Sequence, residues 1–235
     1  GTGFILSEKG IIVTCSHVLQ AEKLQVRGYP RPESVEIVFR ANGEKAAARL
    51  LPQAWRAADA EDVAFLQLEG PMPEGVVPLP LGSSDGAAGH QFQSFGFPDQ
   101  SPEEGLYGEG QLIEQTSILG MKVWQVKSSE ITPGFSGGPV FDEQARHVVG
   151  MVTSIAAPDK FGRLSETAFV TPAETLFSIY PAIAADFGSV RGVSGHLPAR
   201  SAPAALDRAE RPPGFGFRAD GHGGDEGRLL QPVCR

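Results

Sequence analysis

A serine flanked by glycines is the strongest chemical signal in this sequence. It lies in the segment Thr132–Pro139 (TPGFSGGP), where Gly134 and Gly137 flank Phe135 and Ser136. Glycines allow a sharp backbone turn that leaves the Ser136 hydroxyl exposed. They also let the amides of Gly134 and Ser136 point at one spot, where they would stabilise an oxyanion. The segment therefore predicts a nucleophilic serine with an oxyanion hole; the alternative is a Gly/Pro-rich turn that contains a serine.

The same residues also fit G-x-S-x-G, the nucleophile elbow of α/β hydrolases. An elbow leads from a strand into a helix. Here the serine is followed by Gly137-Gly138 and then by Pro139–Phe141, which is typical of a turn followed by a strand. This order argues against the hydrolase elbow.

A histidine and an aspartate stand beside two apolar strands. His17 follows the apolar run Ile11–Cys15, and Asp62 opens the run 62–68 (DVAFLQL). Each alone has a simpler interpretation, a structural histidine and an acid that marks a loop. Cys15 has no second cysteine or ligand cluster nearby in the sequence, so it is interpreted as a packed thiol rather than a metal ligand.

Short strands separated by turns dominate the chain, which favours a barrel or sandwich over a βαβ fold. The first set of predicted strands covers residues 3–7, 11–15, 34–40, 46–51 and 62–68. The second set covers residues 90–95, 108–114, 123–127, 139–141, 147–154 and 168–170. Two successive sets predict two barrels.

One helix is predicted, over residues 172–187. Thr171 is its expected N-cap, with Glu174 completing a capping box, and Pro181 predicts a kink or an early stop near Tyr180. Beyond it, residues 188–235 are rich in Gly and Pro and are expected to be a flexible linker or tail.

The segments TCSHV, DVAFLQL and GFSGGPV resemble the His, Asp and Ser motifs of the trypsin-like serine proteases, in that family's chain order. Gly96-Phe97-Pro98 resembles the G-x-P turn of the second barrel, and residues 149–153 (VGMVT) resemble the strand that binds the substrate backbone. The segment AFVTP (168–172) and the following helix resemble the bacterial HtrA-like branch in particular. The resemblance covers about residues 1–187 and lacks the family's first strand, which should precede Gly1.

The resemblance implies an all-β chymotrypsin fold of two six-stranded antiparallel barrels, about residues 1–80 and 88–171, with a C-terminal helix. It implies a triad in which Ser136 attacks, His17 takes its proton and Asp62 orients His17, with an oxyanion hole formed by Gly134 and Ser136. No cofactor or metal is required. The implied substrate-binding residues are Glu130, Thr153, Ser154 and Ile155.

Two positions bear on regulation and specificity. Secreted members of the family carry an acid just before the serine, which pairs with a new N-terminal ammonium after activation. Phe135 stands there in this chain and cannot make that ion pair. Glu130 lies six residues before Ser136, where the floor of the primary specificity pocket is expected, so an acid would favour Lys or Arg in the substrate; the alternative is a solvated residue.

The composition limits partners and compartment. With 20 basic and 28 acidic residues the net charge is −8, which disfavours nucleic acid and anionic membranes as partners. Only two cysteines occur in 235 residues, which predicts free thiols in a reducing, cytoplasmic compartment. Two functional hypotheses follow: a serine endopeptidase, acting on protein or peptide as the effector of a larger protein with domains beyond either terminus, or a silent protease-fold module that binds peptides.

Overall fold

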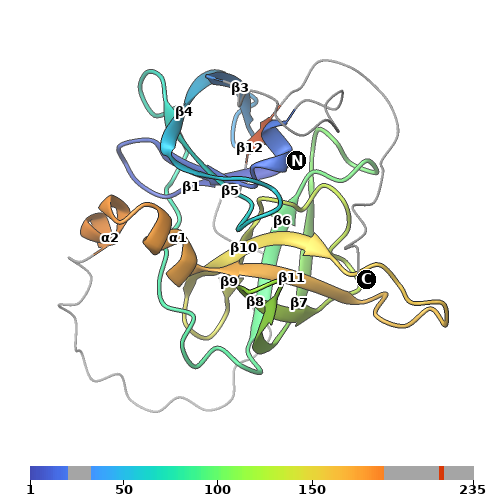
Figure 1. Ribbon diagram of the computed structural model, residues 1–235. Helices are drawn as coiled ribbons and strands as arrows, with labels where there is room; N and C mark the ends of the chain where they lie inside the picture. The colour runs from blue at the N-terminus through green and yellow to red at the C-terminus, as the bar shows by residue number, and fades with distance from the viewer. Residues whose placement is uncertain (21–32, 188–216, 220–235) are drawn as a thin grey trace, which may run out of the picture.

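The computed structural model describes residues 1–20, 33–187 and 217–219, which form two closed antiparallel barrels of six strands each (Figure 1). The predicted all-β fold with two six-stranded barrels is thereby confirmed.

Barrel one has the strand order β1-β12-β3-β4-β5-β2. Its strands are β1 (Thr2–Ile5), β2 (Ile11–Thr14), β3 (Ser34–Phe39), β4 (Lys45–Arg56), β5 (Val63–Leu68) and β12 (Phe217–Ala219). A short 3-10 turn, η1 (His17–Leu19), follows β2.

Barrel two has the order β10-β11-β8-β7-β6-β9. Its strands are β6 (Gln91–Gly96), β7 (Leu106–Ile118), β8 (Met121–Lys127), β9 (Pro139–Asp142), β10 (His147–Ile155) and β11 (Thr167–Pro172). All six come from one continuous stretch of chain.

Strand β12 comes from the segment that was expected to be only a linker or tail. Phe217–Ala219 pairs antiparallel with β1 on one side and with β3 on the other. Barrel one was expected to be short of the family's first strand, and in the structure β12 closes it instead. The rest of the predicted tail lies outside the described residues.

The strand that precedes His17 and the strand that follows Asp62 are buried on both faces. In β2, Ile12 packs inside barrel one, whereas Ile11 and Val13 pack into a second core that joins barrel one, barrel two and the helices. In β5, Phe65 faces this shared core and Leu66 the barrel interior. Burial on both faces explains why these strands read as continuous apolar runs rather than as alternating patterns.

The C-terminal helix is interrupted at Pro181, as its sequence predicted. Helix α1 (Ala173–Ile179) ends at Tyr180, and α2 (Ala182–Phe187) begins just after Pro181. Leu176 and Ile179 pack into the shared core, which fixes α1 against both barrels. Helix α1 follows directly from the end of β11 (Figure 1).

The expected capping box does not form. The helix begins one residue later than predicted, so the N-cap is Pro172, which has no side-chain acceptor. Thr171 belongs to β11, and its hydroxyl is bonded to that of Thr153 at 2.6 Å. Glu174 instead accepts hydrogen bonds from Ser83 and Ser84 in the connection between the barrels.

Candidate active site

His17 and Asp62 are brought together by the pairing of two strands. β2 runs antiparallel to β5 with Thr14 opposite Ala64, so the end of β2 lies beside the start of β5. The Asp62 backbone has a φ of 54°, a left-handed conformation in which aspartate is tolerated better than most side chains. Its Oδ2 lies 2.5 Å from Nδ1 of His17.

Both oxygens of the Asp62 carboxylate are hydrogen-bonded to neighbouring residues. Its Oδ1 accepts hydrogen bonds from the Ser16 hydroxyl at 2.7 Å and from the His17 backbone amide at 3.0 Å. The Asp62 side chain is 8% exposed, whereas that of His17 is 25% exposed. A buried carboxylate at Nδ1 favours the imidazole tautomer with the proton on Nδ1, which leaves Nε2 as the acceptor on the exposed side.

Residues Thr132–Phe135 form a type II β-turn. The Phe135 amide donates to the Thr132 carbonyl at 3.1 Å, and Gly134 has a φ of 103°. Pro133 and Gly134 occupy the two central positions that this turn type prefers for proline and glycine. In such a turn the amide of the glycine makes no bond within the turn, so the Gly134 N–H is available to an external acceptor.

Phe135 anchors this turn by burial where an acid would use an ion pair. It is 1% exposed and belongs to the core of barrel two. Gly96 and Gly108 leave room for its ring, since a Cβ at either position would collide with or crowd Phe135. Full burial of an aromatic side chain stabilises by about 1.5–3 kcal/mol, so the loop has an apolar anchor within the domain.

Ser136 is held against the start of β1, the strand that pairs with β2. Its carbonyl accepts from the Thr2 amide at 2.9 Å. The next amide, of Gly137, donates to the Val152 carbonyl at 2.8 Å, and the same carbonyl accepts from the Cys15 thiol at 3.3 Å. The Ser136 segment and the His17 segment therefore meet at Val152. Within the described part of the chain the Ser136 hydroxyl makes no hydrogen bond. In enzymes without bound substrate, the hydrogen bond from a nucleophile to its general base is often long or poorly aligned.

Cys15, His17 and Asp62 are the one group among the described residues whose side chains are close enough to share a metal ion, with ligand atoms within 4.8 Å of one another. The chemistry of the group does not suit a metal. Burial, and then the charge of Asp62, raise the pKa of the Cys15 thiol, so it does not readily form the thiolate that binds a metal. Both Asp62 oxygens already accept hydrogen bonds.

The predicted substrate-binding residues lie in barrel two. Glu130 is exposed, and its Oε2 accepts from the Glu109 amide at 2.9 Å. Thr153 is the extra residue of a bulge between Val152 and Ser154, and its hydroxyl is bonded to Thr171. Ser154 is exposed and Ile155 packs on the barrel core.

The backbone of this segment has one open side. Pairing of β10 with β9 ends at Met151, whereas pairing with β11 continues to Ile155. The edge of β10 over residues 153–155 therefore has no strand partner among the described residues. An unpaired edge of this kind can add an extended peptide as a further strand.

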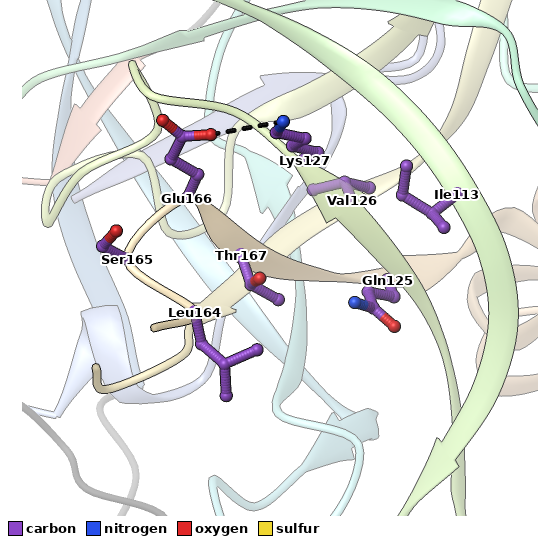
Figure 2. Close-up of a pocket in the computed structure, with 8 residues that line it drawn as sticks. All are labelled: Ile113, Gln125, Val126, Lys127, Leu164, Ser165, Glu166 and Thr167. Carbon is purple, nitrogen blue, oxygen red and sulfur yellow. Dashed lines mark ion pairs between the residues drawn. The ribbon is translucent and has the colours of Figure 1, made fainter. Parts of the chain in front are cut away.

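A separate surface pocket lies where β8 and β11 meet (Figure 2). Its lining includes the exposed ion pair of Lys127 with Glu166, whose atoms are 3.5 Å apart, and the apolar side chains of Ile113 and Leu164. None of the predicted site residues lines it. In the described residues, no helix is both long and apolar enough to cross a membrane.

Comparison with known proteins agrees with this geometry. The family model of the trypsin-like peptidase domain matches residues 1–151, so the chain belongs to the trypsin-like peptidase family. No curated protein matches the chain significantly.

The solved structures with a similar fold include HtrA-type proteases. The HtrA-type protease AlgW with a decapeptide is 21% identical, with a TM-score of 0.60 over 80% of this chain and 52% of that one. The inactive form of the Rv3671c protease is 22% identical, with a TM-score of 0.55 over 78% of this chain and 83% of that one. This chain thus spans about half the length of AlgW, and these likenesses confirm the predicted chymotrypsin-type fold.

Two residues of the site were not singled out from the sequence. Ser16 bonds the Asp62 carboxylate, and its only signal was its position next to His17. Thr2 holds the Ser136 carbonyl, and its signal was a polar residue in a strand that is otherwise apolar.

Proposed function

We propose that this domain is a serine endopeptidase that cleaves peptide bonds through Ser136, His17 and Asp62. The observation that carries the proposal is the hydrogen bond from His17 to the buried Asp62, together with a serine on a glycine turn. That turn and the His17 segment are both bonded to the Val152 carbonyl. A module that only binds peptides has no need of a buried carboxylate aimed at an imidazole.

The chemistry follows from these groups. Nε2 of His17 accepts the proton as the Ser136 oxygen bonds to the scissile carbonyl carbon. The amides of Gly134 and Ser136 stabilise the tetrahedral oxyanion, and a donor of this kind is worth about 3–4 kcal/mol. The imidazolium returns its proton to the leaving amine, which gives an acyl-enzyme that water hydrolyses by the reverse route. Asp62 stabilises the imidazolium throughout.

The substrate of this proposal is an extended peptide. The open edge of β10 at residues 153–155 offers backbone groups to it, and Glu130 supplies negative charge near the side chain before the scissile bond. A role as the effector of a larger protein, in a reducing compartment such as the cytoplasm, remains part of the proposal. Two cysteines in 235 residues support that compartment.

Labelling with a fluorophosphonate probe tests the activity. The wild-type chain is expected to be labelled once, and Ser136→Ala to lose labelling without loss of fold. Ser117→Ala, an exposed serine in β7, is the matched control and is expected to label at the wild-type rate. Asp62→Asn is expected to slow labelling by about 10⁴-fold, because the histidine then adopts the wrong tautomer.

Failure of the folded wild-type chain to label would favour the silent peptide-binding module. Labelling that survives Ser136→Ala would mean that the nucleophile is another residue. Equal rates for Asp62→Asn and the wild type would remove Asp62 from the mechanism.

A further inference from the structure

Thr2 is a buried polar residue whose backbone and side chain both bind the nucleophile loop. It is 0% exposed. Its amide donates to the Ser136 carbonyl at 2.9 Å, and its hydroxyl donates to the Gly134 carbonyl at 2.7 Å. The hydroxyl also accepts from the Phe97 amide at 3.2 Å, and the Thr2 carbonyl accepts from the Thr14 hydroxyl.

The two carbonyls that Thr2 holds flank the amide of Ser136. Because a peptide unit is planar, fixing its carbonyl fixes the direction of the whole unit. The unit after Gly134 is held by Thr2 at its carbonyl and by Thr132 at its amide. The unit after Ser136 is held by Thr2 at its carbonyl and by Val152 at its amide. The intervening unit carries the Ser136 N–H, and its own carbonyl accepts from the Gly138 amide at 2.7 Å. Thr2 fixes the units on either side of it.

The hydroxyl is the part of Thr2 that another residue would not supply. Any residue except proline offers the amide, but only threonine or serine offers a hydroxyl at this position to the Gly134 carbonyl. Without it, that carbonyl would keep only the Phe97 amide at 3.2 Å, a bond that is now shared with Thr2. An acceptor left poorly paired in a buried site is unfavourable, so the Gly134 peptide would turn towards another donor.

We propose that Thr2 is a positioning residue that sets the oxyanion hole in its working direction. This inference rests on the proposed peptidase function. Thr2 does not touch the substrate; it acts through the Gly134 and Ser136 peptides. Together with the burial of Phe135, it does within the domain what an activating ion pair does in members that carry an acid before the serine.

Thr2→Val and Thr2→Ser form the decisive pair of variants. Valine keeps the shape and removes the hydroxyl, whereas serine keeps the hydroxyl. Losing one oxyanion donor outright typically costs about 10²–10³ in rate, and Thr2 only orients such donors, so Thr2→Val is expected to slow fluorophosphonate labelling about 10–100-fold. Thr2→Ser is expected to stay within about threefold of the wild type.

A second readout separates positioning from general loss of structure. Phenylboronic acid forms a tetrahedral adduct with a catalytic serine, and its affinity can be measured as protection against the fluorophosphonate probe. Thr2→Val is expected to weaken that affinity by a factor similar to its loss of labelling rate. Thr14→Val removes a hydroxyl of equal burial that bonds the Thr2 carbonyl and leaves the Gly134 contact intact. It is expected to lower the melting temperature as Thr2→Val does, with a labelling rate within about threefold of the wild type.

The outcomes are distinguishable from failure of the proposed function. If the wild type does not label, the peptidase proposal fails. If the wild type labels and Thr2→Val labels and binds boronate equally well, only the role of Thr2 is overturned. Equal losses for Thr2→Ser and Thr2→Val would also overturn it, because the hydroxyl would then be irrelevant. Should Thr2→Val not fold, Thr2→Cys replaces it with a weaker donor of similar size, and a wild-type labelling rate for that variant overturns the inference.

Discussion

The two barrels share one topology but close it in different ways. In barrel two, the place between β7 and β9 is held by β6, which is that barrel's first strand in chain order. In barrel one, the matching place between β1 and β3 is held by β12, which is the last strand of the described chain. Barrel two is therefore complete within residues 91–172, whereas barrel one depends on a segment about 150 residues beyond β5 in sequence.

This difference matters for the site because β12 borders the strand that carries Thr2. Arg218 is the register partner of Thr2, whose other contacts hold the turn at residues 134–136 of barrel two. Without β12, β1 and β3 would each have an unpaired edge. The strand that closes barrel one is thus the direct neighbour of the strand that bonds the proposed oxyanion hole.

Arg218→Pro is the variant with the largest expected effect on stability. Proline is tolerated in edge strands, where its missing N–H would face solvent. Because β12 lies between two strands, proline there would remove a hydrogen bond between strands. By analogy with proline in a helix interior we expect a loss of about 3 kcal/mol in the free energy of unfolding. That corresponds to a fall of roughly 6–12 °C in melting temperature for a domain of this size. Hydrogen exchange should accelerate in β1 and β3 and stay unchanged in β7 and β8.

Two variants control for the substitution itself. Arg218→Val keeps the backbone amide and is expected to melt within about 2 °C of the wild type. Ala205→Pro introduces proline into the Pro/Ala-rich stretch 202–205, which composition predicts to be a linker, and is therefore expected to have no effect. If Arg218→Pro also leaves the melting temperature unchanged, β12 contributes nothing to barrel one, and residues 188–235 behave as the tail that their composition predicted.

The contrast between the barrels also explains what the sequence could predict. Apolar runs bounded by turn residues were sufficient to predict the strands next to His17 and Asp62, because burial on both faces leaves a strong local pattern. Phe217–Ala219 has only three residues in a Gly/Pro-rich context, and its partners lie far away in sequence. A strand this short leaves no periodic pattern, so the composition of the segment predicted a linker instead. The role of Thr2 depends on contacts more than 130 residues away, which no local spacing encodes.

Glu174 couples the connection between the barrels to helix α1. Its carboxylate accepts from the Ser83 and Ser84 hydroxyls and from the Ser84 amide, and the Ser84 hydroxyl also accepts from Gln115 in β7. Partial burial opposes ionisation of Glu174, but the hydrogen bonds from Ser84 and Ser83 outweigh it and lower the pKa of the carboxyl below its ordinary value. The charged form is therefore favoured by folding.

Glu174→Gln is expected to lower stability by about 1 kcal/mol at pH 7, a modest amount because Glu174 is also exposed to solvent. A carboxyl with a lowered folded-state pKa stabilises the fold above its unfolded-state pKa. That contribution is lost as the pH falls through the folded-state value. Denaturant unfolding of the wild type and of Glu174→Gln should therefore give free energies of unfolding that differ at pH 7 and converge as the pH falls to 3. A difference that is constant with pH would mean that the charge of Glu174 is not the cause.

The smallest expected effect concerns Glu130, which contrasts with Asp62 as an acid of the other barrel. Asp62 is buried and paired, whereas Glu130 is exposed and uses Oε2 to accept from the Glu109 amide. An exposed charge acts on a substrate Lys or Arg with about 1 kcal/mol at most, which is roughly a fivefold preference. Glu130→Gln keeps the acceptor for Glu109 and removes only the charge, so it is expected to reduce the preference for a basic residue before the scissile bond by that factor. A peptide library cleaved by both chains measures this directly. Identical cleavage profiles would show that Glu130 is a solvated residue of the loop, with no part in specificity.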